Sequence, residues 1–252
     1  MGTDNLFHKK RQARHHLRRE ASKSYGSRKS LRVLIVSDDS KSAVYYFEAL
    51  RDDLGLTQKK VEIDRKGGGF DQKSLVDYAI SKFDQEKELL KKRYGLKEAL
   101  PYDRVYCVFD QDAYHYKDSH QKKYQEALNE IDRINAKLAL PDDIFKAITS
   151  VPCYEFWLLL HCQFMMRSFA NTQQRSVCDM VISELKSKEC MPHYDKKDKK
   201  IYAKTKEKLT TAIKNAERVE IERQKIGTDN PSTLIHLLVK DLQGMSGSTP
   251  TS

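Results

Sequence analysis

Short apolar runs alternate with helix-length amphipathic segments between residues 31 and 165, and this alternation limits the fold more than any other feature of the chain. Four apolar runs have the length and β-branched content of strands, and the segments between them carry apolar residues at helical spacing. The strands are expected at 33–36, 61–63, 105–109 and 144–148, and the helices at 41–54, 71–94 and 124–138. Strands separated by helices predict parallel βαβ units, and therefore a Rossmann-like α/β core with a parallel central sheet.

Composition divides the chain into four segments. Residues 1–30 form a basic arm without apolar periodicity, which is typical of a flexible segment, and residues 31–165 form the α/β core. Residues 166–243 are expected to form a Lys-rich helical part, and residues 244–252 a flexible Gly/Ser/Thr tail. Pro152 is expected to open a helix at its first position, where the missing N–H costs nothing.

The charge of the chain is concentrated in two places. The net charge is +10, and residues 1–32 hold ten Lys and Arg against two acids, while residues 186–214 hold ten Lys against four acids. Localised positive charge favours a polyanion such as nucleic acid, although a solvated tail and a solvated helix face would look the same. The candidate phosphate contacts are Lys9, Lys10, Arg11, Arg14, Arg18, Arg19, Lys66, Lys196, Lys197, Lys199 and Lys200.

No run of about 18 apolar residues is present, so no membrane partner is expected. The five cysteines are odd in number and form no Cys-x-x-Cys pair, which argues against a disulfide framework or a structural zinc site. Buried free thiols in a reducing cytoplasm are the expectation.

Asp110 and Asp112 directly follow the apolar run at 105–109. In an extended segment, residues two apart point the same way, and the carboxyl ends of strands are where open α/β sheets bind ligands. Carboxylate oxygens are ligands that Mg²⁺ prefers, so the motif indicates a Mg²⁺ site, with Mn²⁺ as an alternative. Asp-x-Asp also occurs in ordinary turns, in glycosyltransferases and in phosphatases that use the first Asp as nucleophile. That phosphatase chemistry requires the motif after the first strand, and here it follows the third.

Asp38 and Asp39 follow the first apolar run. If the first and third strands are neighbours in a parallel sheet, Asp38 lies near Asp110, and acids gathered at one sheet edge favour a bound cation. The alternative is that Asp38 or Ser40 caps the next helix. A bound cation and a helix cap can both be present, because Asp38 and Asp39 are two adjacent acids.

Three segments resemble motifs of the RloB family. Residues 33–47 are similar to its opening motif, residues 102–112 to its Asp-x-Asp segment, and residues 150–161 to its Ser-Asn-Pro-Cys-Phe-Glu-x-Trp-Leu-Leu-Leu-His signature. Residues 65–69 and 230–239 resemble its glycine-containing strand exit and its C-terminal ending.

The resemblance implies a toprim-like fold and a role in restriction and phage-defence loci, with a partner defence protein. In toprim enzymes an acid after the first strand is a general acid/base, and an Asp-x-Asp binds Mg²⁺ during phosphodiester cleavage. Carried over by position, Asp38 is the general base or a third metal ligand, Asp110 and Asp112 hold the metal, and Glu155 is an acid near the site. The leading hypothesis is therefore a Mg²⁺-dependent nuclease.

The chain departs from the family pattern at the first site. Asp38 stands where the pattern has Glu, and Asp39 where it has Gly. A displacement near 1 Å can cost about 100-fold in rate, so a weakened or inactive nucleic-acid-binding sensor or scaffold of a defence system is the alternative function. Glu155 is also explained by the dipole of its helix, and His161 as a core histidine.

Overall fold

The computed structural model describes residues 31–96, 100–111, 118–170, 174–187 and 191–247. The strands are β1 (Val33–Ser37), β2 (Val61–Asp64), β3 (Arg104–Asp110), β4 (Phe145–Val151) and β5 (Ser232–Thr233). The α-helices are α2 (Ser42–Asp53), α3 (Gln72–Tyr94), α4 (Asp118–Leu138), α5 (Glu155–Leu160), α6 (Val177–Ser187), α7 (Ile201–Thr205), α8 (Leu209–Ile226) and α9 (Ile235–Ser246). Two short 3-10 helices, η1 (Arg65–Gly67) and η2 (Lys206–Lys208), complete the described elements.

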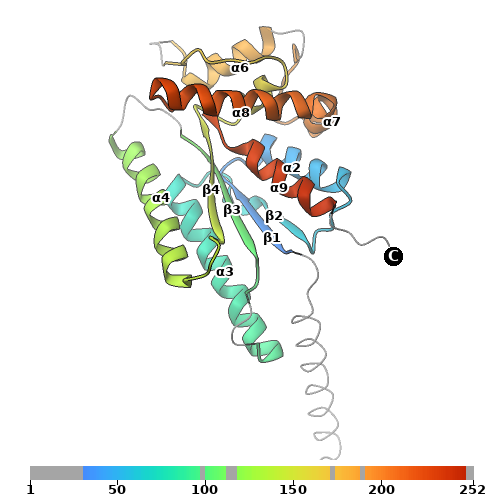
Figure 1. The fold of residues 1–252 in the computed structure, drawn as a ribbon, viewed down its shortest axis with the longest axis vertical. Helices are drawn as coiled ribbons and strands as arrows, with labels where there is room; N and C mark the ends of the chain where they lie inside the picture. The colour runs from blue at the N-terminus through green and yellow to red at the C-terminus, as the bar shows by residue number, and fades with distance from the viewer. Residues whose placement is uncertain (1–30, 97–99, 112–117, 171–173, 188–190, 248–252) are drawn as a thin grey trace, which may run out of the picture.

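One five-stranded sheet of order β2-β1-β3-β4-β5 forms the centre (Figure 1). β1 pairs in parallel with both β2 and β3, and β3 pairs in parallel with β4. The predicted parallel α/β sheet is therefore confirmed. The two-residue β5, which pairs antiparallel with β4, was not predicted, because so short a strand leaves no alternation in the sequence.

Helices cover both faces of the sheet, and successive residues of β1 belong to different layers. Val33 and Ile35 pack with α2 and the C-terminal helices, whereas Leu34 and Val36 pack with α3 and α4. This alternation follows from the opposite directions of neighbouring side chains in a strand. The continuous apolar run of β1 is thus explained by burial on both faces.

The two connections that leave β1 and β3 diverge. α2 follows β1 on one face and leads to β2, whereas α4 follows β3 on the other face and leads to β4. β1 and β3 are neighbours, so the loops at their carboxyl ends leave the sheet toward opposite faces. Such a switch point is where open α/β sheets bind ligands.

The C-terminal helices share a hydrophobic core with the sheet. One cluster joins Ile35 of β1 and Phe47 of α2 to Trp157 of α5, Val219 of α8 and Leu242 of α9. The predicted helical C-terminal part is confirmed, and α9 continues to Ser246, beyond the expected boundary at residue 243.

The Lys-rich segment 192–200 is not helical, contrary to expectation. The carboxylate of Asp195 accepts a hydrogen bond from the amide of Lys197 at 2.8 Å, and that of Asp198 accepts one from the amide of Lys200 at 2.9 Å. These local bonds offer the backbone an alternative to the helix. The segment therefore forms turns.

The expectation that Pro152 opens a helix is also wrong. α5 begins at Glu155, and Pro152 precedes it in a cis peptide bond with Val151. Residues 152–154 form the connection that aims the first turn of α5 at the carboxyl edge of the sheet.

The cysteine expectation holds in part. Cys107, Cys153 and Cys178 are free, and the first two are buried. Cys162 takes part in a disulfide, so the prediction of free thiols is wrong there. Among the described residues, no helix has both the length and the apolar character needed to cross a membrane.

Candidate functional site

The carboxyl ends of β1 and β3 bring Asp38 and Asp110 together. The amide of Asp38 continues the ladder by donating to the carbonyl of Val108 at 3.1 Å. The amide of Asp110 donates to Oδ2 of the Asp38 carboxylate at 3.0 Å. The predicted proximity of these two acids is confirmed, and the Asp38 side chain holds the backbone that carries Asp110.

Helix α3 holds the same backbone from the opposite face. The side-chain amide of Gln72, the first residue of α3, donates to the carbonyl of Asp110 at 2.9 Å. The next amide along the chain, that of Gln111, donates to the carbonyl of Ser150 on β4 at 2.9 Å. The loop after β1, helix α3 and strand β4 therefore all fix residues 110 and 111. These are the last residues that the structure describes before position 112.

Asp39, and not Asp38 or Ser40, bonds the amides at the start of α2, whose N-cap residue is Lys41. Its two carboxylate oxygens accept hydrogen bonds from the amides of Lys41 at 2.7 Å and Ala43 at 2.9 Å. These bonds satisfy amides at the start of the helix, which have no partner within it. The adjacent acids thus have different partners: Asp39 bonds the start of α2, and Asp38 bonds the backbone of Asp110.

The exit of β2 packs tightly against the exit of β1. A Cβ atom on Gly67 would lie 2.5 Å from the carbonyl oxygen of Ser37, and one on Gly68 would lie 2.3 Å from Cβ of Ser40. The amide of Gly69, which has a φ of +86°, donates to the carbonyl of Asp38 at 2.9 Å. Glycines are required here because the two loops touch through their backbones. Lys66 beside them is exposed.

Asp64 is an acid at the same sheet edge that the sequence did not single out. Its carboxylate accepts hydrogen bonds from the hydroxyl of Tyr78 at 2.9 Å and the amide of Lys66 at 2.8 Å, and forms an ion pair with Lys82. Burial alone would raise the pKa of Asp64, but these partners outweigh it and lower the pKa. Asp64 is thus a neutralised structural acid.

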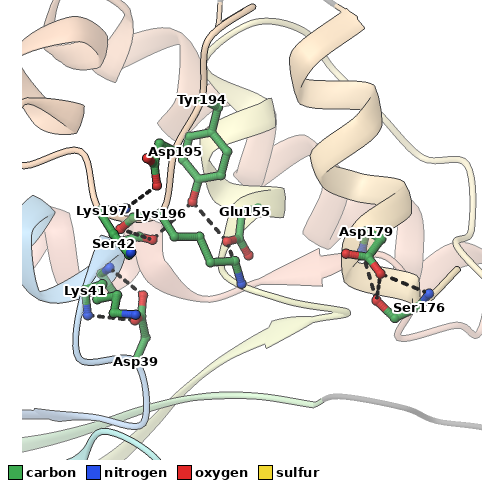
Figure 2. A network of polar contacts seen from close by, with 11 residues as sticks. Asp39, Lys41, Ser42, Glu155, Ser176, Asp179, Tyr194, Asp195, Lys196 and Lys197 are labelled. Carbon is green, nitrogen blue, oxygen red and sulfur yellow. Dashed lines mark hydrogen bonds and ion pairs between the residues drawn. The ribbon is translucent and has the colours of Figure 1, made fainter.

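Glu155 lies at the centre of a buried network, with Ser42, Tyr194 and Lys196 (Figure 2). Its side chain is 2% exposed. One oxygen, Oε1, accepts a hydrogen bond from the Tyr194 hydroxyl at 2.9 Å and pairs with Nζ of Lys196 at 3.0 Å. The hydroxyl of Ser42, at the start of α2, lies 3.1 Å from the Tyr194 hydroxyl and donates to the carbonyl of Lys196 at 3.2 Å. We call these four residues the Glu155 network.

The charges in the Glu155 network support one another. Burial disfavours the charged form of Lys196, but the negative charge of Glu155 outweighs it, and the pKa of Lys196 is raised. The pKa of Tyr194 is raised by burial and by the same carboxylate. The network is therefore an ion pair, with a neutral tyrosine beside it, at neutral pH.

The Glu155 network lies within electrostatic reach of Asp110 and Asp39. The pKa of the Cys153 thiol is raised by burial, by Cys178 and by the charges of Glu155 and Asp110, which act on the same buried sulfur. Asp39 likewise contributes to the raised pKa of Tyr194. The carboxyl end of the sheet thus carries acids on β1 and β3 and a bound lysine on the neighbouring loop.

A family model described as RloB-like protein matches residues 33–242 of the 252. The chain belongs to the RloB-like family. No curated protein matches the chain, and no solved structure matches it. In this RloB-like protein, the match begins at β1 and ends in α9, so it includes the sheet, the switch point and the Glu155 network.

Several predicted site residues of the RloB-like protein lie outside the described part. These are Asp112 and the arm residues Lys9, Lys10, Arg11, Arg14, Arg18 and Arg19. Lys197, Lys199 and Lys200 are exposed in the turns of segment 192–200. Lys196 differs from them, because its ammonium group is paired with Glu155.

His161 is a core histidine, as predicted. It is 1% exposed, its Nδ1 donates to the carbonyl of Trp157 at 3.1 Å, and its Nε2 lies 3.3 Å from the Tyr46 hydroxyl. Burial lowers the pKa of His161 to about 4, so the ring is neutral at physiological pH.

The sequence missed Ser42, Asp39 and Asp64 as parts of the site. Tyr194 lies among the lysines of segment 192–200, and its hydroxyl faces Glu155. Asp39 carries no cap signal in the sequence, because it lies two residues before Lys41, the N-cap residue of α2. No sequence signal joins Ser42 to Tyr194, which are 152 residues apart.

Proposed function

We propose that this RloB-like protein is a Mg²⁺-dependent nuclease that cleaves phosphodiester bonds at the β1–β3 switch point, in the defence role that the family resemblance implies. The observation that carries the proposal is the hydrogen bond from the Asp110 amide to the Asp38 carboxylate. It joins two acids at adjacent strand ends, at the switch point where this class of sheet binds ligands.

The donor set fits Mg²⁺ or Mn²⁺ better than zinc, because it consists of carboxylates without cysteine or histidine. Within the described ranges, no group of three or more His, Cys, Asp and Glu is placed to hold a metal. Mg²⁺ usually binds one or two carboxylates and completes its shell with water and phosphate. Asp110 and Asp38 would hold the ion, with Asp112 as the further ligand that the motif predicts. When bound, the ion polarises a phosphoryl oxygen and activates a water molecule.

The chain's own residues position the substrate. The half-exposed side chain of Lys196 carries a positive charge suited to a phosphate of the nucleic acid backbone. Glu155 is too buried to reach a solvent-borne phosphate, so its role is to hold Lys196 and to keep it charged. Glu155 is therefore a positioning residue in this proposal rather than the catalytic acid that the resemblance implies.

One observation favours the non-catalytic alternative, a nucleic-acid-binding scaffold. Oδ2 of Asp38 already accepts the Asp110 amide, so the shorter acid at this position has a structural partner within the protein. A general base needs its carboxylate within hydrogen-bond reach of the attacking water.

A cleavage assay separates the two functions. The purified full chain is incubated with tRNA, single-stranded DNA and duplex DNA, in Mg²⁺, in Mn²⁺ and in chelator. Asp110→Asn keeps the size of the side chain and removes its charge, and Asp84→Asn, at an exposed position on α3, is the matched control. We expect metal-dependent cleavage that Asp110→Asn lowers at least about 100-fold and Asp84→Asn leaves unchanged.

Other outcomes would reject the nuclease. Salt-sensitive binding without cleavage, equal in both variants, identifies the scaffold. Phosphate released from a monoester, without cleavage of any diester, identifies a phosphatase.

A further inference from the structure

A groove of about 650 Å³ lies along the amino-terminal half of β4, away from the carboxyl end of the sheet that carries the acids. α4 packs on one face of β4 and α9 on the other (Figure 1). Leu128 and Ile131 of α4 form one apolar wall, and Ile148 and Leu237 form the other, beside Lys146 and Lys240, of which Lys240 is paired with Glu217. Leu237 is 45% exposed, so this wall is open to a partner.

The floor of the groove is the edge of the sheet. Even-numbered residues of β4 turn their backbone groups to β3: the carbonyl of Ser150 accepts the amide of Gln111. Odd-numbered residues therefore face outward. Three of these have partners, because the Asn135 side chain bonds both backbone groups of Phe145, the carbonyl of Thr149 accepts the amide of Leu234, and Val151 pairs with β5.

Ala147 is the exception on this edge. It lines the groove, and its outward amide and carbonyl have no hydrogen-bond partner in the part of the chain that the structure describes. Unpaired backbone groups on an edge strand are a template for an added strand. β5 ends just beyond, on the same side of β4, so an added strand would extend the line that β5 begins.

The entrance of the groove is acidic. Asp132 on α4 and Asp143 before β4 line it, and Asp142 is next to them in the chain. All three side chains are exposed, and none has an ion-pair partner among residues 31–96, 100–111, 118–170, 174–187 and 191–247. Lys146 of β4 also lines the groove, but the acids at the entrance outnumber it, so this end selects for a basic occupant.

The basic arm of the chain starts next to this entrance. The carbonyl of Arg32 accepts the amide of Asp103, just before β3, and Val105 of β3 is paired with Phe145 of β4. Because neighbouring strands are about 4.8 Å apart, β1 starts only about 10 Å from the edge of β4. Thirty residues precede Leu31, and an extended chain spans about 3.3 Å per residue, so the arm reaches the whole groove.

We propose that the N-terminal arm docks in this groove as an added strand, with Leu6 and Phe7 beside Ala147 and with Lys9, Lys10 and Arg11 at the acidic entrance. Adjacent residues of a strand point to opposite faces, so Leu6 and Phe7 would each meet one apolar wall. The arm enters from the amino edge with its basic residues following the apolar pair. The added strand therefore runs antiparallel to β4, as β5 does. The inference does not depend on the proposed nuclease function.

Hydrogen exchange of the full chain, without nucleic acid, tests the docked strand. A triple variant, Asp132→Asn with Asp142→Asn and Asp143→Asn, removes the acidic entrance. We expect the Ala147 amide to exchange about tenfold faster in the triple variant than in the wild type. The Ile148 amide, which faces β3, should exchange equally in both, and Asp84→Asn should change neither. Equal exchange of the Ala147 amide in wild type and triple variant would overturn the proposal.

Trypsin cleavage of the arm gives a second measurement. Ala147→Pro removes the outward N–H but leaves the ladder to β3, because proline is accepted where a strand edge faces outward. We expect cleavage after Arg11 to be about tenfold faster in Ala147→Pro and in Phe7→Ala than in the wild type. Unchanged cleavage in variants that melt like the wild type contradicts docking. A wild-type cleavage rate that falls with protein concentration would assign the strand to a second copy instead, and this too overturns the proposal.

Discussion

At the scale of single residues, Glu155 is the position where charge and burial conflict most. Its carboxylate is 2% exposed, and Lys196 is the cation within ion-pair distance of it among the described residues. A buried charge that loses its partner is costly, whereas the loss of both members of a pair costs little. The pair should therefore respond very differently to single and double substitution.

We predict that Lys196→Met lowers the free energy of unfolding by about 1–3 kcal/mol, less than for a fully buried pair because Lys196 is half exposed. Adding Glu155→Gln should restore most of that loss, and Lys197→Met, at the exposed neighbouring position, should change stability by less than about 0.5 kcal/mol. Urea unfolding measures the free energy of unfolding of the wild type and of these three variants. A double variant that loses the sum of the single effects would show that the pair is not coupled.

His161 gives a pH-dependent prediction. Burial lowers the pKa of His161 from 6.5 to about 4 in the folded protein. Between these two pH values the unfolded state binds a proton at His161 and the folded state does not. The stabilisation is complete above pH 6.5 and is lost as the pH falls toward 4. We expect the wild type to lose up to about 3 kcal/mol more than His161→Gln between pH 7 and pH 4, as measured by urea unfolding at each pH. Parallel pH curves for the two proteins would argue against a buried neutral ring.

At the scale of elements, the loops at the carboxyl end of the sheet are fixed by backbone contact. η1 packs on the end of β1 through Gly67 and Gly68, and Gly69 holds Asp38 by its carbonyl. Asp39 starts α2 from the same loop. The direction of the Asp38 side chain therefore depends on the packing of two loops.

We predict that Gly67→Ala destabilises the protein by about 1–3 kcal/mol, because its Cβ would lie 2.4 Å from Cδ1 of Leu75 and 2.5 Å from the carbonyl of Ser37. Gly244→Ala in α9 is the matched control. Nothing lies within 4 Å of its Cβ, and alanine favours a helix, so stability should rise by up to about 1 kcal/mol. Thermal unfolding compares them, and a Gly67→Ala variant as stable as the control would refute the close approach.

The elements that could be predicted from the sequence are those whose buried apolar residues follow the spacing of a strand or a helix. The apolar runs of β1 and β3 and the periodic faces of α2, α3 and α4 gave the correct types. Segment 192–200 was not predictable from its lysines, because Asp195 and Asp198 bond the local backbone and end the helical pattern. At the site, the pairing of Asp38 with Asp110 followed from strand order, but the Glu155 network required the folded position of a distant loop.

At the scale of the whole molecule, the α/β core and the C-terminal helices bury one another. A single cluster contains Ile35, Phe47, Trp157, Val219 and Leu242, which come from β1, α2, α5, α8 and α9. The Glu155 network adds polar links between the same two parts.

We predict that residues 31–247 unfold as one cooperative unit. In scanning calorimetry of the full chain, the calorimetric enthalpy should equal the van't Hoff enthalpy of a single transition. Far-ultraviolet circular dichroism and Trp157 fluorescence should report the same midpoint, since Trp157 lies in the shared cluster. Two separated transitions would show that the C-terminal helices form an independent domain.

The hydrogen bond between the Asp38 carboxylate and the Asp110 amide makes substitutions at these two positions unequal in their effects. A substitution of Asp38 removes a partner of the Asp110 amide and so affects both acids, whereas a substitution of Asp110 by any residue except proline keeps that amide. Energetic effects of contacting residues do not add, so the effect of a substitution at position 38 depends on how the chain runs at position 110. Asp38→Glu lengthens this side chain by one methylene, and the end of β3 would have to shift to keep the hydrogen bond.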